Sequence, residues 1–328
     1  MLSGTRSPAT RWLDLLKRDP VPWLLDPVNP SARLSTLRHL FKRPETALHE
    51  ENARLLAWSP IVILREHWDR VNFWGREYDP YFGGALGNFG TLYLFMQLGM
   101  SQSCRPHFPE IEPACENLLD RGRGEDGRFA AGSTAVSSES ASWLCYTGMA
   151  LQIMWGFGYE NDLRARSALA ALLHTVLLRP ELLDCPIASG GCAHGLVKAL
   201  AALVSIPAEQ RGTDEEAVIA VLGESLINYP FDFSGRDVEW LQPTFPRYYH
   251  ADIVELCRVM AQTTFRTHPR FQGWLHLLLS LKTDEGRWNK ARPSPALSEE
   301  RLFHPSRWLT FEAVHALTLT YGDTVYAP

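Results

Sequence analysis

The amino-acid sequence predicts an all-α fold, an α/α toroid in which about five to six helical hairpins close into a ring. Three features support this prediction. A short spaced motif recurs with a period of about fifty residues, as in proteins built from repeated helical units. Between its copies, apolar residues recur every three or four positions, and no segment alternates apolar and polar residues as a half-buried strand would.

The repeated motif consists of an aliphatic residue, a polar or aromatic residue four positions later, a small or polar residue after eight and usually an aromatic residue after ten. Its copies, from clear to faint, are Leu64/Trp68/Asn72/Trp74, Leu119/Arg123/Gly127/Phe129, Leu278/Lys282/Gly286/Trp288, Ile227/Phe231/Gly235/Asp237 and Leu173/Leu177/Glu181/Leu183. Because each unit of such an array buries its apolar face against its neighbours, the repeat predicts one continuous core.

Residues 1–43 are predicted to form an N-terminal helical arm, and residues 44–328 a single toroid domain on which the arm wraps. Within the arm, a helix is expected over residues 31–41, with Ser31 placed to cap it. After the arm, helices are expected in pairs. The first of each pair carries charges on one face and is expected on the outside: 46–68, 108–122, 161–178, 214–229 and 268–282.

The second helix of each pair is rich in small and apolar residues on several sides, which predicts an inner position: 86–100, 140–157, 191–204, 251–263 and 308–319. A closed ring is favoured over an open solenoid, since solenoids need polar capping repeats and neither end of the chain shows one. Long loops precede the inner helices, so a ring would gather these loops and the inner-helix starts at one mouth.

Composition excludes some function classes. The formal net charge is −5 and no basic stripe is present, so a nucleic-acid partner is not expected. No apolar run approaches the roughly 20 residues of a transmembrane segment, and the amino terminus lacks a secretory pattern, which predicts a cytoplasmic protein. The six cysteines are scattered along a long chain, as expected for reduced thiols.

The run Leu278, Lys282, Gly286 and Trp288 resembles a degraded form of the Gln/Trp repeat motif of squalene and oxidosqualene cyclases, with Lys282 where that family has Gln. Protein prenyltransferase β subunits use the same ring. More specifically, the chain resembles short bacterial single-ring proteins described as squalene-cyclase-like or prenyltransferase-like. The matching stretches lie within residues 20–320 and are 143–145, 192–198, 245–255 and 306–310. The resemblance implies an α/α toroid whose cavity accepts an isoprenoid.

The chain also departs from these families. It contains neither the Asp-x-Asp-Asp acid of class II cyclases nor the Asp-Asp-x-x-Asp metal motif of ionisation-type synthases, and it lacks the second domain of the large cyclases. Standard terpene cyclisation is therefore not predicted, and whether the chain is an enzyme is left open.

A metal site is one interpretation of the inner-helix starts. Cys192 and His194 open one inner helix and Asp252 opens the next, and zinc accepts these three ligand types in a tetrahedral shell. Protein prenyltransferases similarly hold zinc with an Asp, a Cys and a His. The alternative is that Cys192 is a small buried apolar residue and that His194 bonds to a backbone carbonyl, because residues two apart on a helix do not share a face.

A second interpretation is a catalytic, metal-free proton-transfer set of His250, Asp252 and Glu255. If Asp252 and Glu255 share the cavity wall, burial and mutual repulsion would raise the pKa of one carboxyl group. The alternative is that Asp252 caps a helix or forms an ion pair, while Glu255 meets Lys198 or Arg258.

Aromatic residues are candidates for substrate binding. Those at inner-helix starts could contact a prenyl chain, and those beside Gly83 could form a lid; the alternative is packing between repeats. The candidates are Trp143, Tyr146, Trp308, Tyr78, Tyr81 and Phe82.

The sequence is compatible with three functions. The first is binding or transformation of an isoprenoid or other apolar chain in the central cavity, with zinc as a possible cofactor. The second is a non-catalytic toroid scaffold that recruits a protein partner through its mouth loops. The third is a carbohydrate-active α/α barrel, for which Asp79, Glu125 and Asp126 are the acids available in the mouth loops.

Overall fold

The structure of the chain is a computed structural model, and it describes residues 12–68, 74–129, 144–178, 192–293 and 302–322. Within these ranges the elements are helices, apart from a two-stranded antiparallel sheet of β1 (Trp288–Asn289) and β2 (Pro305–Ser306). Short 3-10 helices connect them: η2 (Leu13–Leu15), η3 (Glu45–Ala47), η4 (Gly84–Leu86), η5 (Gln102–His107), η8 (Ala208–Gln210), η9 (Val238–Leu241) and η10 (Thr264–Thr267). The predicted all-α class is confirmed.

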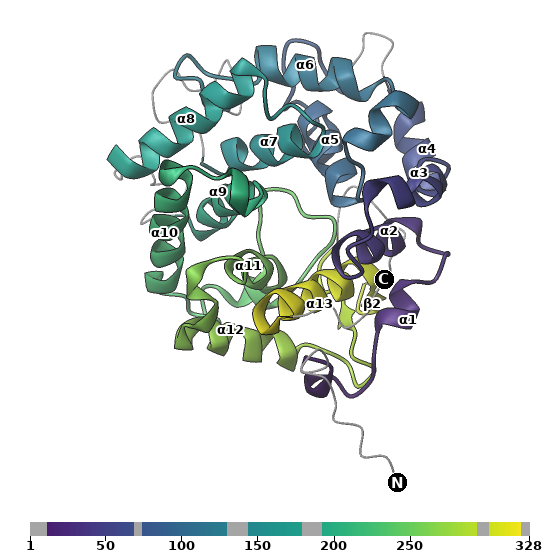
Figure 1. Cartoon of the computed structure of the whole chain (residues 1–328), viewed down its shortest axis with the longest axis vertical. Helices are drawn as coiled ribbons and strands as arrows, with labels where there is room; N and C mark the ends of the chain where they lie inside the picture. Colours follow the sequence, from purple (N-terminus) through teal and green to yellow (C-terminus); the bar gives the residue numbers. More distant parts are fainter. Residues whose placement is uncertain (1–11, 69–73, 130–143, 179–191, 294–301, 323–328) are drawn as a thin grey trace.

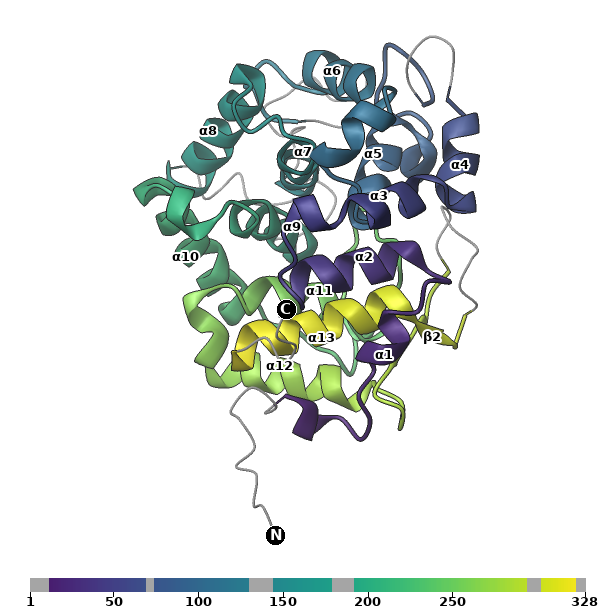
Figure 2. The same ribbon diagram turned by 45° about the vertical axis from the view of Figure 1, so that its right-hand side comes forward.

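The helices form two concentric layers, as Figures 1 and 2 show. The inner layer consists of α2 (Pro30–His39), α5 (Asn88–Gln97), α7 (Leu144–Gly156), α9 (Ala193–Val204), α11 (Ile253–Met260) and α13 (Arg307–Tyr321). The outer layer consists of α1 (Val21–Leu24), α3 (His49–Leu56), α4 (Ser59–Glu66), α6 (Ile111–Arg121), α8 (Leu163–Leu178), α10 (Thr213–Asn228) and α12 (Pro269–Ser280). Successive inner helices pack on one another from α5 to α13, and each packs on an outer helix. The predicted α/α toroid is therefore confirmed.

A chain of hydrogen bonds closes the ring between its first and last inner helices. The indole Nε1 of Trp308, at the start of α13, donates to Ser31 Oγ of α2 at 2.6 Å. Ser31 Oγ in turn donates to the carbonyl oxygen of Leu98, just after α5, at 2.7 Å. The segment predicted as an N-terminal arm thus supplies α2, which packs between α13 and the α5 end. The predicted cap was wrong, because the side chain of Asn29, not that of Ser31, accepts from the backbone at the start of α2.

The repeated motif lies at the carboxyl-terminal ends of outer helices and provides hydrogen bonds to their last carbonyl groups. In two copies the aromatic residue at position ten folds back, and its indole Nε1 donates to the carbonyl oxygen of the aliphatic residue: Trp74 to Leu64 and Trp288 to Leu278, both at 2.8 Å. The glycine at position eight of the last copy, Gly286, has a φ of +71°, which glycine adopts without strain. The motif therefore satisfies helix-end carbonyls that would otherwise lack partners.

Nine of the ten predicted helices correspond to single helices of the structure. The exception is the outer helix of the first pair. There the predicted helix 46–68 divides into α3 and α4, because Pro60 has no N–H for a helix interior and lies instead in the first turn of α4. No helix in the described ranges has the length and apolar character needed to cross a membrane.

Close packing between α7 and α9 depends on a glycine. A Cβ atom at Gly148 would lie 2.5 Å from the backbone of Lys198, so only glycine allows the two helices to approach this closely. Gln152 Nε2 then donates to the carbonyl oxygens of Gly148 and Lys198, at 3.3 and 3.2 Å. This contact fixes Lys198 at the centre of the ring.

Candidate functional site

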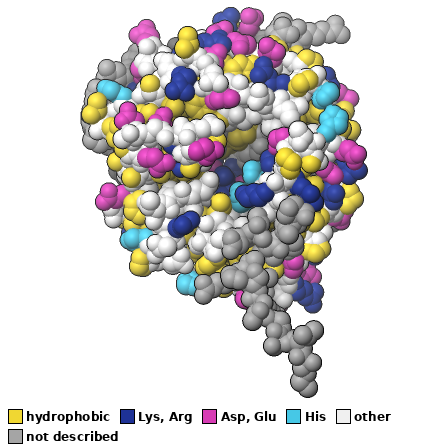
Figure 3. All heavy atoms as spheres, viewed as in Figure 1, with side chains coloured by type: hydrophobic (Ala, Val, Ile, Leu, Met, Phe, Trp, Pro, Cys, Tyr) yellow, Lys and Arg dark blue, Asp and Glu magenta, His cyan; other side chains and the backbone are white. Residues whose placement is uncertain are grey.

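A cavity of about 660 Å³ lies inside the ring, and Figure 3 shows the hollow at the centre of the molecular face. Every inner helix contributes to its wall. The lining includes Arg38, His39, Tyr93, Met96, Gln97, Met100, Gln152, Trp155, Ala201, Arg247, Glu255, Arg258, Phe311, Glu312 and His315. In α2, α5, α7 and α9 the lining residues lie in the carboxyl-terminal half of the helix. The cavity therefore lies towards the opposite end from the inner-helix starts, where sequence reasoning placed the site.

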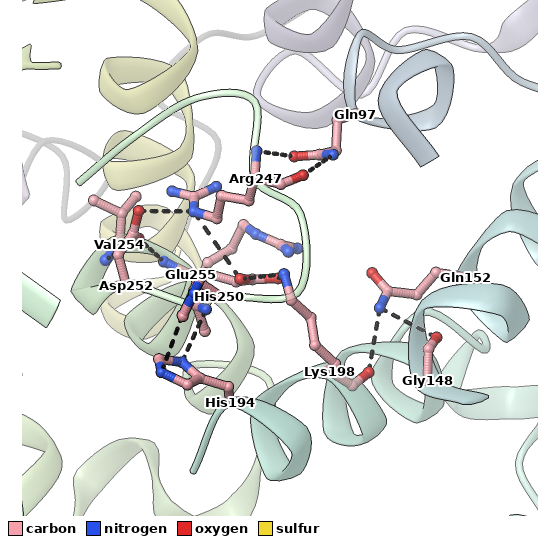
Figure 4. A network of polar contacts seen from close by, with 12 residues as sticks. Gln97, Gly148, Gln152, His194, Lys198, Arg247, His250, Asp252, Val254 and Glu255 are labelled. Atoms are coloured by element: carbon pink, nitrogen blue, oxygen red, sulfur yellow. Dashed lines mark hydrogen bonds and ion pairs between the residues drawn. The ribbon is translucent and has the colours of Figure 1, made fainter. Parts of the chain in front are cut away.

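Residues 242–250, which we call the crossing segment, run through the ring between the cavity and the inner-helix starts. Arg247 and Gln97 of α5 exchange two hydrogen bonds: Gln97 Nε2 donates to Arg247 O at 2.8 Å, and Arg247 N donates to Gln97 Oε1 at 2.9 Å (Figure 4). Phe245 stacks on Trp308 with ring centroids 4.6 Å apart, and Tyr248 packs edge-on against Tyr146. The crossing segment is thus fixed to α13, α5 and α7.

The cavity floor is a buried network of ion pairs. Lys198 Nζ donates to both carboxylate oxygens of Glu255, at 2.8 and 2.7 Å, and to the hydroxyl of Tyr93 at 3.1 Å. Arg247 Nε donates to Asp252 Oδ2 at 2.8 Å, and its Nη1 donates to Glu312. Arg258 Nε lies 3.8 Å from Glu312. Three cations and three anions therefore balance, as burial of charge requires.

Asp252 is fully occupied by hydrogen bonds. Its Oδ1 caps α11 by accepting from the backbone N–H groups of Val254 and Glu255, and its Oδ2 accepts from Thr244 N as well as Arg247 Nε. Burial works against ionisation, but Arg247 and these donors outweigh it and lower the pKa of Asp252. The interpretation of these carboxyl groups as proton donors required a raised pKa in one of them, but the pKa of Asp252 is lowered. The alternative is confirmed: Asp252 caps and forms an ion pair, and Glu255 meets Lys198.

His250, the last residue of the crossing segment, contacts His194 in the first turn of α9. His194 Nδ1 accepts from the backbone N–H of Ala251 at 3.0 Å, and its Nε2 lies 3.5 Å from His250 Nδ1. The His194 ring also stacks on Trp240, with centroids 4.5 Å apart. Burial, followed by the nearby His250, lowers the pKa of His194 to about 3, so its ring is neutral near pH 7. The pair joins the end of the crossing segment to the start of α9.

The predicted zinc ligands do not fit a metal centre. Among the described residues, the compact cluster of ligand atoms, all within 4.8 Å, comprises His194, Glu239 and His250, and includes neither Cys192 nor Asp252. Both oxygens of Asp252 already accept two hydrogen bonds each. A metal-bound histidine normally donates its second ring N–H to an acceptor, whereas His194 Nδ1 faces the N–H of Ala251. We therefore derive no zinc chemistry for this chain.

The predicted aromatic binding residues occupy several environments. Tyr146 packs among Tyr81, Phe89 and Tyr248, and burial raises its pKa to about 12. Tyr81 donates to Gly122 O at 2.7 Å. The exposed residues Tyr78 and Phe82 flank Arg76, whose guanidinium lies 3.6 Å from the Phe82 ring centroid. Trp308 closes the ring as described, and Trp143 lies outside the described residues.

The five of these aromatic residues that the structure describes do not line the central cavity. Of the three acids considered for carbohydrate chemistry, Asp79 accepts from Tyr81 N and Asp126 forms an ion pair with Arg128, so both hold local turns. The residues that do line the cavity and that sequence reasoning missed include Arg247, Phe311 and Glu312. The signal available for Arg247 was its place in the 245–255 stretch, five residues before Asp252.

Comparison with known proteins gives a structural likeness alone. No protein-family model and no curated protein matches the chain. Among solved structures, the chain is similar to the type II terpene cyclase MstE from Scytonema in its apo form, with 15% identity and a TM-score of 0.32, over 85% of this chain and 100% of that one. A variant of that enzyme in complex with geranylgeranyl dihydroxybenzoate shows 14% identity and a TM-score of 0.32, over 85% and 99% of the two chains.

Proposed function

We propose that this toroid binds an isoprenoid or another apolar chain in its central cavity. The observation that carries the proposal is the cavity itself, whose volume of about 660 Å³ lies within the range of roughly 300–1,000 Å³ typical of ligand pockets. Its wall combines an apolar and aromatic part, which can contact a hydrocarbon chain, with a larger number of polar and charged side chains, which can contact a polar head group. The apolar part includes Met96, Met100, Trp155, Ala201 and Phe311.

Binding is favoured over proton-initiated cyclisation. An acid that protonates an alkene must be held in its neutral form, and the environment of Asp252 favours the ionised form instead. Glu255 and Glu312, the carboxylates that line the inner part of the cavity, each face a cation. A wall of paired charges gives a rigid, oriented binding site.

The proposal is tested by filling the cavity. Ala201 lies on α9 with its side chain in the cavity lining, so Ala201→Phe places a ring in the space that the ligand would occupy. We expect calorimetric binding of the C20 alcohol phytanol to fall at least tenfold in this variant. Ala208→Phe, in the exposed 3-10 turn that follows α9, is the matched control and should bind like the unmodified protein.

A failure of the unmodified protein to bind phytanol, squalene or any other apolar chain would contradict the proposed function. Equal binding by the Ala201→Phe variant would place the ligand elsewhere. The thermal midpoint of each variant shows whether the ring itself remains folded.

A further inference from the structure

We propose that the cavity selects an uncharged molecule with an oxygen acceptor, such as an alcohol or aldehyde, and discriminates against carboxylates and phosphates. This inference rests on the proposed function and assigns the polar end of the ligand. Three independent features of the cavity lead to it: unpartnered donors, a balanced set of charges, and the direction of the surrounding helices.

Three buried hydrogen-bond donor atoms of the cavity lining make no hydrogen bond in the part of the chain that the structure describes: Nη2 of Arg247, Nε of Arg258 and the indole Nε1 of Trp155. Arg258 Nε already lies 3.8 Å from Glu312 Oε1, which leaves Nη2 of Arg247 and Nε1 of Trp155. Buried donors are normally satisfied, so each such group indicates a missing acceptor. The ligand that completes this site therefore needs an oxygen that can accept.

The charges around the cavity already cancel. On the floor, Lys198 faces Glu255. Arg247 faces both Asp252 and Glu312, and Arg258 also lies against Glu312, so three cations meet three anions. At the rim, Arg38 pairs with Glu45 through its Nε at 2.6 Å. An added carboxylate or phosphate would lack a free cation among these groups and would bring an unpaired negative charge to a largely buried site.

The helix ends also disfavour an anion. The cavity lining draws on the carboxyl-terminal ends of α5, α7 and α9, through Gln97, Gly156 and Ser205. The carboxyl end of a helix carries partial negative charge because its last carbonyl groups have no partner within the helix. Several such ends around one cavity repel anions and leave a neutral oxygen as the preferred acceptor.

Four C20 probes with one saturated isoprenoid chain test the inference: phytanol, phytanic acid, phytanyl diphosphate and the hydrocarbon phytane, each titrated calorimetrically at pH 8. We expect phytanol to bind at least tenfold more tightly than the acid and the diphosphate. Tighter binding of either anion would overturn the inference while leaving the proposed function intact. If none of the four binds, the proposed function fails instead.

Trp155→Phe tests the donor directly, since it removes the indole N–H and keeps an aromatic ring. We expect the affinity for phytanol to fall about fivefold, as for loss of one neutral hydrogen bond, with the affinity for phytane unchanged. The matched control is Trp12→Phe, because Trp12 Nε1 is also buried without a partner among the described residues but lies outside the cavity lining. Equal losses for phytanol and phytane in Trp155→Phe would overturn the role of the donor.

Glu312→Gln provides a second, charge-based test. Glu312 faces both Arg247 and Arg258, and Arg247 keeps Asp252 as a partner, so removing the Glu312 charge leaves one unmatched positive charge at the cavity. We expect phytanic acid to bind at least fivefold more tightly to this variant than to the unmodified protein, with phytanol changed less than twofold. An unchanged affinity for phytanic acid would show that charge balance does not control selection.

Discussion

The two sides of the crossing segment differ in what their polar residues do. On the side of the inner-helix starts, His194 contacts His250, accepts from the backbone N–H of Ala251 and stacks on Trp240. On the other side, Arg247 and Glu255 line a cavity. The two histidines therefore lie where the chain segments are held together, whereas the cavity lies beyond them. The comparison teaches that the inner-helix starts and the cavity lie on different sides of the crossing segment, whose Arg247 itself lines the cavity.

The largest expected effect comes from breaking the ion pair beneath the cavity. Lys198 and Glu255 are both buried, and Glu255 raises the pKa of Lys198 although burial alone would lower it. Lys198→Met leaves Glu255 without its cation, and we expect a loss of about 3–5 kcal/mol in the free energy of unfolding, measured with urea.

The control for this prediction is the double variant Lys198→Met, Glu255→Met, in which both charges are removed. It should recover most of the lost stability, because replacing a buried ion pair by apolar side chains is often close to neutral. A loss below about 1 kcal/mol in the single variant would mean that water reaches the floor of the cavity.

A smaller effect is expected at Asp252, where asparagine can still cap α11 through its side-chain oxygen but carries no charge for Arg247. Asp252→Asn should lower stability at pH 7 by about 2–3 kcal/mol. Because the pKa of Asp252 is lower in the folded protein than in the unfolded chain, its contribution is complete above the unfolded value of about 4 and is lost as pH falls through the folded value.

The difference in the free energy of unfolding between the unmodified protein and Asp252→Asn should therefore become smaller as the pH is lowered below about 4. Urea titrations at a series of pH values will measure this difference. A gap that stays constant down to pH 2 would show that Asp252 acts through hydrogen-bond geometry and not through its charge.

Local sequence patterns predicted the ring because they report on local physics. Periodic apolar residues set which helices are inner, and the ten-residue spacing between Leu278 and Trp288 is the distance over which the indole returns to its own helix end. Even the Lys198–Glu255 pair followed from the rule that a buried charge needs a partner.

The cavity could not be predicted in the same way. Its location depends on the crossing segment, which is fixed by the exchange of hydrogen bonds between Gln97 and Arg247, residues 150 positions apart in the chain. No periodic pattern links such residues. The starts of inner helices attracted attention because Cys192, His194 and Asp252 lie there, but the side chains of Asp252 and His194 satisfy backbone N–H groups.

The smallest expected effect tests whether the two sides of the crossing segment are separate. Tyr78 and Phe82 were predicted to cover a ligand, yet both are exposed and neither lines the cavity. If the ligand space lies on the far side of the crossing segment, Tyr78→Ala and Phe82→Ala should each change the affinity for phytanol less than twofold, by calorimetry. A tenfold loss in either variant, with an unchanged thermal midpoint, would instead show that the ligand reaches the mouth loops, and that the crossing segment moves aside when it binds.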